Sequence, residues 1–219
     1  MTGLRPTVAS VDLDAIRHNV RVLLPRDAAL MAVVKADAYG HGAAPVARAA
    51  VEAGATWLAV ALVEEGMALR DAGIREPILV LSEVPRGAER AALGAALVPT
   101  VYTATGIDAL AAAARDLGGR FPVHLKVDTG MHRVGVWPPS AVADLAARVV
   151  DAGLDLEGLT THLASADADD AFTATQLGRF REAIDAVTAR VGRPRIVHAA
   201  NSAATRRFPE ATFDLVRTG

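Results

Sequence analysis

The chain has 219 residues, 52% of them hydrophobic, with 25 acidic and 23 basic side chains and a formal net charge of −2. So apolar a composition excludes disorder, and a balanced charge without a basic stripe argues against a nucleic-acid partner. The absence of cysteine excludes disulfides and cysteine-based metal sites. No signal-peptide core and no apolar run of roughly 18 residues is present, so we expect a soluble cytoplasmic protein without a membrane partner.

The first segment of the chain, residues 1–25, predicts a short strand and then a helix. The pattern begins at Val8, and Ile16, Val20 and Leu23 recur on one helical face. Pro25 ends the helix. We expect this segment to precede the main sheet.

Eight short apolar runs then alternate with amphipathic helical stretches, most of which end in a glycine. A representative helix is predicted over 140–152, with Ser140 as its cap. Strict alternation implies a parallel sheet with crossover helices, and eight strands in roughly 200 residues can close into a (β/α)8 TIM-type barrel. An open doubly wound sheet is the alternative. The predicted strands are 31–36, 57–62, 78–82, 98–103, 123–128, 156–162, 196–201 and 213–218.

Polar side chains follow the carboxyl ends of these strands, where the active sites of barrel enzymes lie. Of the 23 basic residues only Lys35 and Lys126 are lysines, and an amine can attack a carbonyl whereas a guanidinium cannot. Lys35 follows an apolar strand, so its amine would enter a poorly hydrated site and could form a Schiff base. Alternatively, Lys35 caps the strand and pairs with Asp37 or Asp128.

The last two predicted strands lead to a candidate phosphate site. Ser202 begins a predicted helix over 202–207, and Gly219 follows the eighth strand. Loops after strands seven and eight of barrels commonly bind phosphate, although Ser202 could also be a plain helix cap. His162 and His198 lie on apolar strands and are interpreted as core or supporting residues. No metal-ligand spacing occurs, so we predict no metal.

Five motifs resemble the alanine racemase family. AVVKADAYGHG (32–42) is similar to its cofactor-lysine signature, and the other four follow in the family's order: KVDTGMHRVG (126–135), THLA (161–164), HAANS (198–202) and VRTG (216–219). The resemblance covers essentially the whole chain. It implies a barrel that binds pyridoxal 5′-phosphate (PLP), followed in the family by a β-rich C-terminal domain, in a head-to-tail homodimer.

The resemblance also implies a role for each matching residue. Lys35 would condense with PLP and act as one of two acid/base groups at the substrate α-carbon. Arg217 would face the pyridine nitrogen, with His198 behind it. Arg133 would contact the substrate carboxylate, and Lys126, in carbamylated form, would hold Arg133 in place. The other cofactor-binding residues would be Tyr39, His162, Asn201, Ser202 and Gly219.

The activity implied is that of an alanine racemase, which interconverts L- and D-alanine and supplies D-alanine for peptidoglycan. The family's second acid/base group is a tyrosine of the C-terminal domain. We therefore expect residues 1–219, as a PLP-binding barrel domain without that C-terminal domain, to racemise weakly or not at all. His132 stands where the family usually has glycine and is expected to crowd the substrate end of the site. The alternatives are a single-domain PLP carrier without racemase turnover and an inert scaffold.

Overall fold

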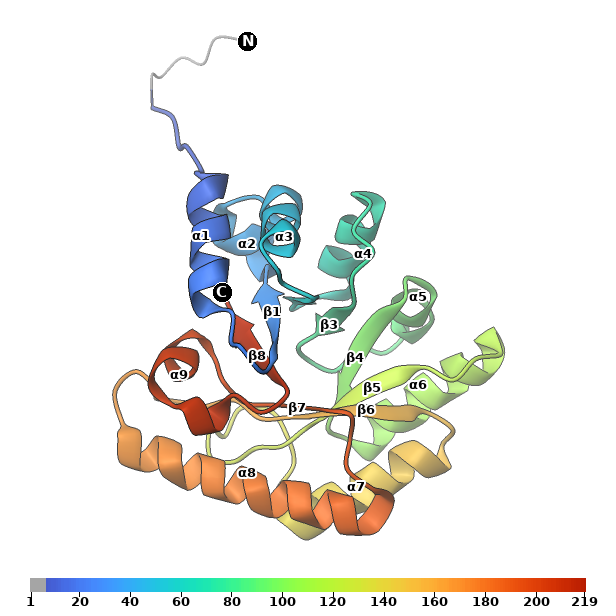
Figure 1. Ribbon diagram of the computed structural model, residues 1–219. Helices are drawn as coiled ribbons and strands as arrows, with labels where there is room; N and C mark the ends of the chain where they lie inside the picture. Colours follow the sequence, from blue (N-terminus) through green and yellow to red (C-terminus); the bar gives the residue numbers. More distant parts are fainter. Residues whose placement is uncertain (1–6) are drawn as a thin grey trace.

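Eight parallel strands form one sheet in the computed structural model, which describes residues 7–219 (Figure 1). Their order is β7-β6-β5-β4-β3-β2-β1-β8. Backbone hydrogen bonds from Asp214 N to Val197 O and from Arg217 N to Ala200 O join the two end strands, so the barrel is nearly closed and the TIM-type prediction is confirmed. The strands are β1 (Ala29–Val33), β2 (Trp57–Val60), β3 (Ile78–Val80), β4 (Leu97–Val101), β5 (Pro122–Lys126), β6 (Asp155–Thr160), β7 (Ile196–His198) and β8 (Leu215–Thr218).

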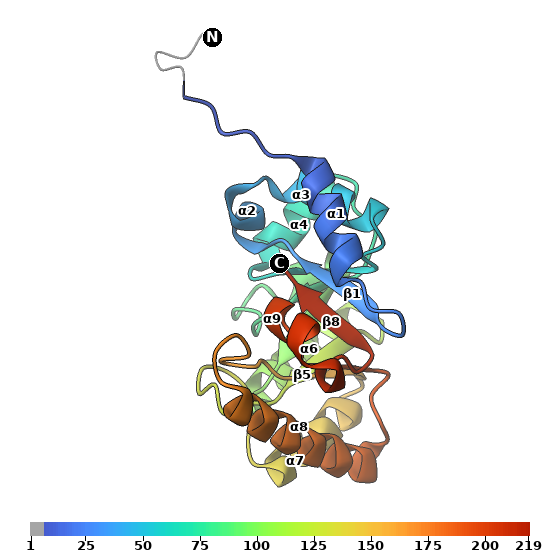
Figure 2. The same cartoon turned by 60° about the vertical axis from the view of Figure 1, so that its left-hand side comes forward.

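Helices cover the outside of this barrel (Figures 1 and 2). Helices α7 and α8 pack against each other, and α1 packs against α3. The helices are α1 (Leu13–Leu23), α2 (Lys35–Gly40), α3 (Ala43–Glu52), α4 (Val63–Asp71), α5 (Glu89–Gly94), α6 (Ala104–Leu117), α7 (Pro139–Asp151), α8 (Asp170–Val191) and α9 (Ser202–Arg207), with a 3-10 helix, η1, at Pro209–Ala211.

The leading segment contains the predicted helix but not the predicted strand. Helix α1 begins after Asp12, whose carboxylate accepts hydrogen bonds from the backbone N–H groups of Asp14 and Ala15. The predicted strand at Val8 is wrong, because residues 7–12 are extended and exposed with no strand beside them in the described part of the chain. Residues 1–6, also part of that prediction, lie outside the described residues.

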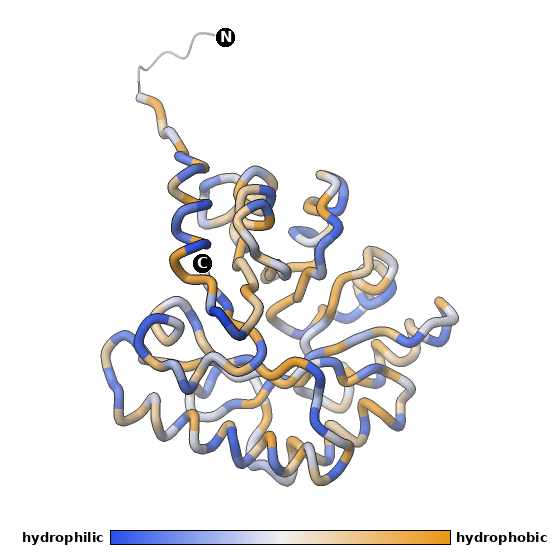
Figure 3. The backbone as a smooth tube through the Cα atoms, in the orientation of Figure 1, coloured by the Kyte–Doolittle hydropathy of each residue, from blue (hydrophilic) through white to orange (hydrophobic). Residues whose placement is uncertain are grey.

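Two apolar clusters make up the core. The larger lies between the strands and the helices, and the strands are accordingly among the most hydrophobic parts of the chain in Figure 3. The smaller fills one half of the barrel interior. Burying each large aliphatic side chain in these clusters contributes about 1.5–3 kcal/mol. The buried members of the smaller cluster are Met31, Trp57, Ala59, Leu79, Val98 and Leu215.

The predicted strands all exist, but most of them end earlier than predicted. The first was predicted to reach residue 36, whereas β1 ends at Val33 and Lys35 begins α2. The reason is a change of backbone hand directly after Lys35, described below. The predicted helix over 140–152 is α7, but Ser140 lies inside its first turn and forms no cap, since the helix begins at Pro139.

Candidate functional site

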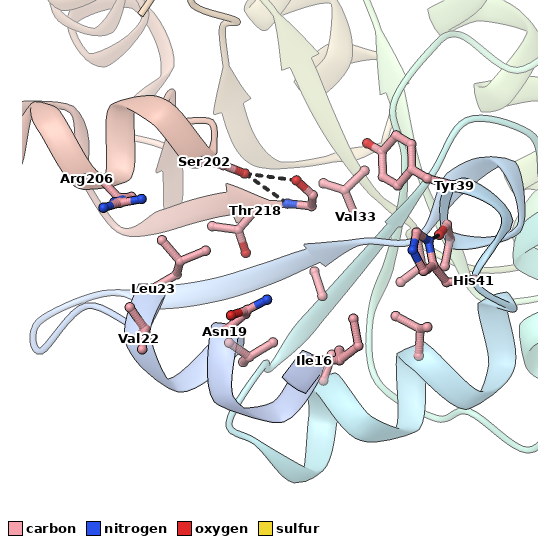
Figure 4. Close-up of a pocket in the computed structure, with 17 residues that line it drawn as sticks. Ile16, Asn19, Val22, Leu23, Val33, Tyr39, His41, Ser202, Arg206 and Thr218 are labelled. Atoms are coloured by element: carbon pink, nitrogen blue, oxygen red, sulfur yellow. Dashed lines mark hydrogen bonds between the residues drawn. The ribbon is translucent and has the colours of Figure 1, made fainter. Parts of the chain in front are cut away.

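A cavity of about 640 Å³ opens at the carboxyl ends of the strands. It brings together every sequence-predicted site residue except His198, which lies behind it. A second cavity of about 450 Å³ extends under α1, where side chains such as Ile16 and Leu23 line it (Figure 4). It shares with the first cavity Val33, Tyr39, Ser202 and Gly219. The predicted residues that line the first cavity are Lys35, Tyr39, Lys126, Arg133, His162, Asn201, Ser202, Arg217 and Gly219.

Lys35 is half-buried at the start of an unusual turn. Ala36–Tyr39 all adopt left-handed backbone angles, with φ between 51° and 55°. Each such non-glycine residue costs about 1–2 kcal/mol. Glu65 stabilises the turn, because its carboxylate accepts hydrogen bonds from the N–H of Ala36 at 2.6 Å, and from those of Ala61 at 2.7 Å and Leu62 at 3.0 Å. This carboxylate ties the residue after Lys35 to the end of β2.

The alternative interpretation of Lys35 as a paired strand cap is not supported. Across residues 7–219 its amine forms no ion pair, either with Asp37 or with Asp128. Asp37 instead accepts a hydrogen bond from the backbone N–H of Ala43 at 2.6 Å, at the start of α3. The Lys35 amine is therefore available to a molecule in the cavity.

The loops after β7 and β8 meet at one corner of the cavity. The Ser202 hydroxyl accepts a hydrogen bond from Gly219 N–H and donates one to Gly219 O, both at 3.1 Å (Figure 4). A Cβ on Gly219 would lie 2.8 Å from Val33 Cβ, so only glycine permits this approach. The helix over 202–207 is confirmed, but its cap is Asn201, whose side-chain oxygen accepts from Ala204 N–H at 2.9 Å.

The cavity concentrates positive charge. Burial, and then the charge of Arg217, lowers the pKa of His162 to about 3, with smaller contributions from Lys126, Arg133 and Lys35. Burial, followed by the charges of Arg217 and Arg133, also holds the pKa of Lys126 well below its ordinary range. His162 is therefore neutral at pH 7, the protonated form of Lys126 is disfavoured beside two arginines, and the cavity suits an anionic ligand.

Arg217 is held rigidly at the base of this cavity, with 5% of its surface exposed. One terminal nitrogen lies 2.9 Å from His198 Nδ1 and 3.3 Å from Thr160 Oγ1, and the other donates to Thr161 O and Ala199 O at 2.8 and 3.1 Å. Burial lowers the pKa of Arg217 to about 10, which leaves it a cation at pH 7. Its Nε–H contacts no acceptor in the described chain and remains available to a ligand.

Arg133 reaches the cavity from a folded loop over 127–136. The Asp128 carboxylate accepts hydrogen bonds from Gly130 N–H at 3.0 Å and His132 N–H at 3.1 Å, which closes the loop. The expectation that His132 crowds the site is wrong: its side chain is 85% exposed and lines no part of the cavity. Its φ of 55° is one that glycine adopts most easily, which accounts for the glycine usual at this position.

Sequence reasoning missed Glu65 at the lysine turn and two buried residues behind Arg217, His124 and Glu157. His124 lies two residues before Lys126, and alternation along a strand points both side chains into the barrel. That spacing could have revealed His124. Nothing in the sequence pattern indicates Glu65 or Glu157.

Neither a metal centre nor a membrane span is found within residues 7–219. No three His, Asp or Glu side chains come close enough together to hold a metal ion. No described helix combines the length and apolar character needed to cross a bilayer.

The fold and this cavity define an α/β barrel with a lysine and fixed cations at the carboxyl ends of its strands. Residues 11–219 match the alanine racemase N-terminal domain model, and the chain belongs to this family. It is 47% identical, over its full length, to the alanine racemase of Symbiobacterium thermophilum and covers 59% of that protein. It is 46% identical to the alanine racemase of Geobacillus stearothermophilus over 98% of its own length, covering 56% of that protein.

Solved structures give the same result. The alanine racemase of Streptomyces coelicolor superimposes on 95% of this chain with a TM-score of 0.89 and 43% identity, and 57% of that structure is covered. The chain therefore spans less than two thirds of the length of these relatives.

Proposed function

We propose that residues 1–219 are the cofactor-binding barrel of a PLP-dependent alanine racemase, which interconverts L- and D-alanine. The observation that carries the proposal is the shared cavity of Lys35, Arg217 and the Ser202–Gly219 corner. The named relatives are alanine racemases, which supports alanine as the substrate. A role in supplying D-alanine for peptidoglycan, a homodimer and a cytoplasmic location stay predictions from the family.

The residues present fit PLP. A phosphate and a substrate carboxylate need cationic and N–H donors, and the cavity is rich in both. The Nε–H of Arg217 has no acceptor in the described chain. The half-buried Lys35 amine lines the same cavity. When bound, PLP withdraws electrons from the α-carbon of an attached amino acid and so acidifies its α-hydrogen.

The cavity residues then have distinct roles toward the cofactor and the substrate. The Lys35 amine would hold the cofactor at its aldehyde carbon and, once displaced there by the amino group of the substrate, would take or return a proton at the substrate α-carbon. Arg217 would donate to the pyridine nitrogen and, as a cation that does not give up its proton, would keep that nitrogen unprotonated. The phosphate would be held by Tyr39, Ser202 and Gly219, with His162 and Asn201 beside the cofactor.

Arg133 and Lys126 would act at the substrate end. Arg133 binds the substrate carboxylate. In its unprotonated form the Lys126 amine would add carbon dioxide, forming an N–C bond and releasing a proton, and the resulting carbamate would hold the Arg133 guanidinium. Carbamylation requires an unprotonated amine, and the lowered pKa of Lys126 supports it.

The first test is covalent trapping of the cofactor. The 219-residue polypeptide is mixed with PLP, reduced with borohydride, digested and mapped by mass spectrometry. We expect a visible absorption band before reduction and a phosphopyridoxyl group on Lys35. Lys126, the second lysine of the chain, is an internal control in the same digest. Absence of the band, or labelling of Lys126 alone, would refute the proposal.

The second test separates a racemase barrel from a PLP carrier and from an inert scaffold. The loaded polypeptide is incubated with L- or D-alanine in deuterated water. Because Lys35 supplies one of the two acid/base groups, we expect α-hydrogen exchange of one enantiomer to exceed interconversion. A carrier would bind PLP without exchanging the α-hydrogen, and an inert scaffold would not bind PLP. Full racemase turnover would contradict the expectation that racemisation needs a second acid/base group besides Lys35.

A further inference from the structure

A line of buried polar groups runs from Arg217 through the barrel toward the amino ends of the strands. His198 Nε2 lies 2.8 Å from His124 Nδ1, and His124 Nε2 lies 3.6 Å from Glu157 Oε2. His124 and His198 are completely buried, and Glu157 is 7% exposed. We call Glu157, His124, His198 and Arg217 the buried relay.

The hydrogen bonds of the relay have only one consistent direction. Arg217 can only donate, so His198 Nδ1 must accept and the proton of the neutral imidazole must lie on Nε2. That N–H donates to His124 Nδ1, which places the His124 proton on Nε2. The His124 N–H then points toward the Glu157 carboxylate, which can only accept.

Both imidazoles are neutral in this arrangement. Burial, with the nearby charge of Arg217, holds the pKa of His198 well below its ordinary value. Burial also lowers the pKa of His124, although Glu157 opposes the shift. Burial would raise the pKa of Glu157, but His124 and Arg195 outweigh it and keep the carboxylate ionised.

Two irregular features of β6, a β-bulge and a glycine, accommodate the buried relay. Strand β6 has one residue too many against β5: Val123 pairs with Leu156 and His124 with Gly158, so Glu157 is the extra residue of a β-bulge. A bulge re-aims a side chain, and here it turns Glu157 toward His124. A Cβ on Gly158 would lie 2.6 Å from three atoms of the His124 ring. The imidazole therefore occupies space that only a glycine leaves free.

At the end of the buried relay, the bulge brings the Glu157 carboxylate to His124. In the described chain, His124 Nε2 and Glu157 Oε2 are the buried side-chain atoms without a hydrogen-bond partner, and they face each other. An approach of several tenths of an ångström would complete the bond. The other Glu157 oxygen contacts Arg195, whose side chain is 68% exposed. The carboxylate is thus anchored from the solvent side and presented to the interior.

We propose that His124 and Glu157 are positioning residues, which hold His198 in the ring orientation and tautomer that accept from Arg217 and thereby fix the orientation of the Arg217 guanidinium in the cavity. This inference rests on the proposed function, in which Arg217 faces the cofactor ring. Neither residue reaches the cavity, so they act only through His198. A histidine held only by Arg217 could rotate about its ring, whereas His198 is held at both ring nitrogens.

Nitrogen NMR of the protein without PLP tests the relay directly. With ¹⁵N-labelled histidine, we expect His124 and His198 each to show a protonated Nε2 and an unprotonated Nδ1. In Glu157→Gln the amide oxygen stays with Arg195, which can only donate, and the NH2 group faces the His124 N–H. We therefore expect the His124 signals to shift or to exchange between tautomers. Glu182→Gln, the same change on the exposed face of α8, should leave them unchanged. A wild-type His198 protonated on Nδ1 would overturn the proposal.

Cofactor affinity tests the consequence for Arg217. Losing one hydrogen bond to a charged group corresponds to a loss of about tenfold in affinity, and we expect a PLP dissociation constant raised by that order in Glu157→Gln and His124→Leu. His124→Gln keeps one acceptor and one donor, so it should restore most of the affinity. Thermal melting checks that each variant is folded; should His124→Leu not fold, Glu157→Gln and His124→Gln still decide.

The two experiments separate the failure of this inference from the failure of the proposed function. If wild-type protein does not bind PLP, the proposed function fails while the NMR result still decides the tautomers. If wild-type protein binds PLP and Glu157→Gln binds it equally well, the relay does not position Arg217 and the inference fails alone.

Discussion

The barrel interior has two unlike halves. On the side of β1 to β4 it is filled by side chains such as Met31, Leu79 and Val98, which are buried and apolar. On the side of β5 to β8 it contains His124 and Arg217 with other buried polar groups, and Leu215 of β8 joins the apolar side. The halves belong to one sheet, but their contributions to the free energy of folding differ.

The apolar half stabilises the barrel by removing hydrocarbon surface from water. The polar half gains little stability, because the desolvation of buried charged and polar groups offsets most of what their hydrogen bonds return. Buried titratable groups that contribute little to stability are found most often at functional sites. Most of the stability of the interior therefore comes from the apolar half, whereas Arg217 is held by the polar half, and substitutions can separate the two.

The largest expected effect is a loss of stability from a cavity in the apolar half. Leu79 is completely buried on β3, so Leu79→Ala should lower the free energy of unfolding by about 2–5 kcal/mol. PLP affinity should be unchanged. Urea denaturation and a PLP titration measure the two quantities. Leu62→Ala, at a side chain that is 53% exposed, is the control and should change stability by less than about 0.5 kcal/mol.

A different outcome for Leu79→Ala would contradict the assignment of the apolar half to stability. If Leu79→Ala weakened PLP binding while leaving the unfolding free energy intact, the apolar half would belong to the binding site.

The order of the strands could be predicted from the sequence because each helix-ending glycine and each apolar run is a local signal. The ends of the strands could not. Strand β1 ends at Val33, shortly before the left-handed turn over Ala36–Tyr39. Glu65, which is distant in the sequence, stabilises that turn. The leading strand at Val8 was wrong for a related reason, since a strand needs a neighbour that a local pattern does not reveal.

The candidate site divides in the same way. Residues such as Lys35 and Arg217 could be predicted because they lie at or near strand ends, where a barrel collects its chemistry. His124 and Glu157 could not, because their meeting depends on a bulge in β6 and on the pairing of β5 with its neighbours. The outward turn of His132 depends likewise on Asp128 closing its loop.

A smaller effect is expected from a single methyl group in the polar half. In Gly158→Ala the new Cβ would overlap the His124 ring, so we expect a loss of about 1–3 kcal/mol and displacement of the imidazole. Gly178→Ala is the matched control: it lies in α8 with nothing within 4 Å of an added Cβ. It should stabilise the protein by about 0.5–1 kcal/mol, because alanine is the better helix former. Thermal and urea unfolding should show that the free energy of unfolding falls in Gly158→Ala and rises in Gly178→Ala. Changes of the same sign would refute the packing argument.

The dependence of stability on pH distinguishes the halves by their chemistry. His162 has a pKa of about 3 in the folded protein, below the ordinary value of 6.5. Between these two values the unfolded chain binds a proton that the folded chain does not, so the free energy of unfolding falls as the pH decreases. The slope for this one group is at most about 1.4 kcal/mol per pH unit. Burial of His124 and His198 acts in the same direction.

Urea unfolding at pH 7 and pH 5 measures this slope while most carboxylates stay ionised. His162→Asn removes one of the groups that must stay neutral, so it should flatten the dependence. Leu79→Ala removes only apolar contacts, so its stability should be lower than wild type by the same amount at both values. A wild-type stability that does not fall between pH 7 and pH 5 would mean that the folded protein accepts protons on these imidazoles, and the direction assigned to the buried relay would then be untenable.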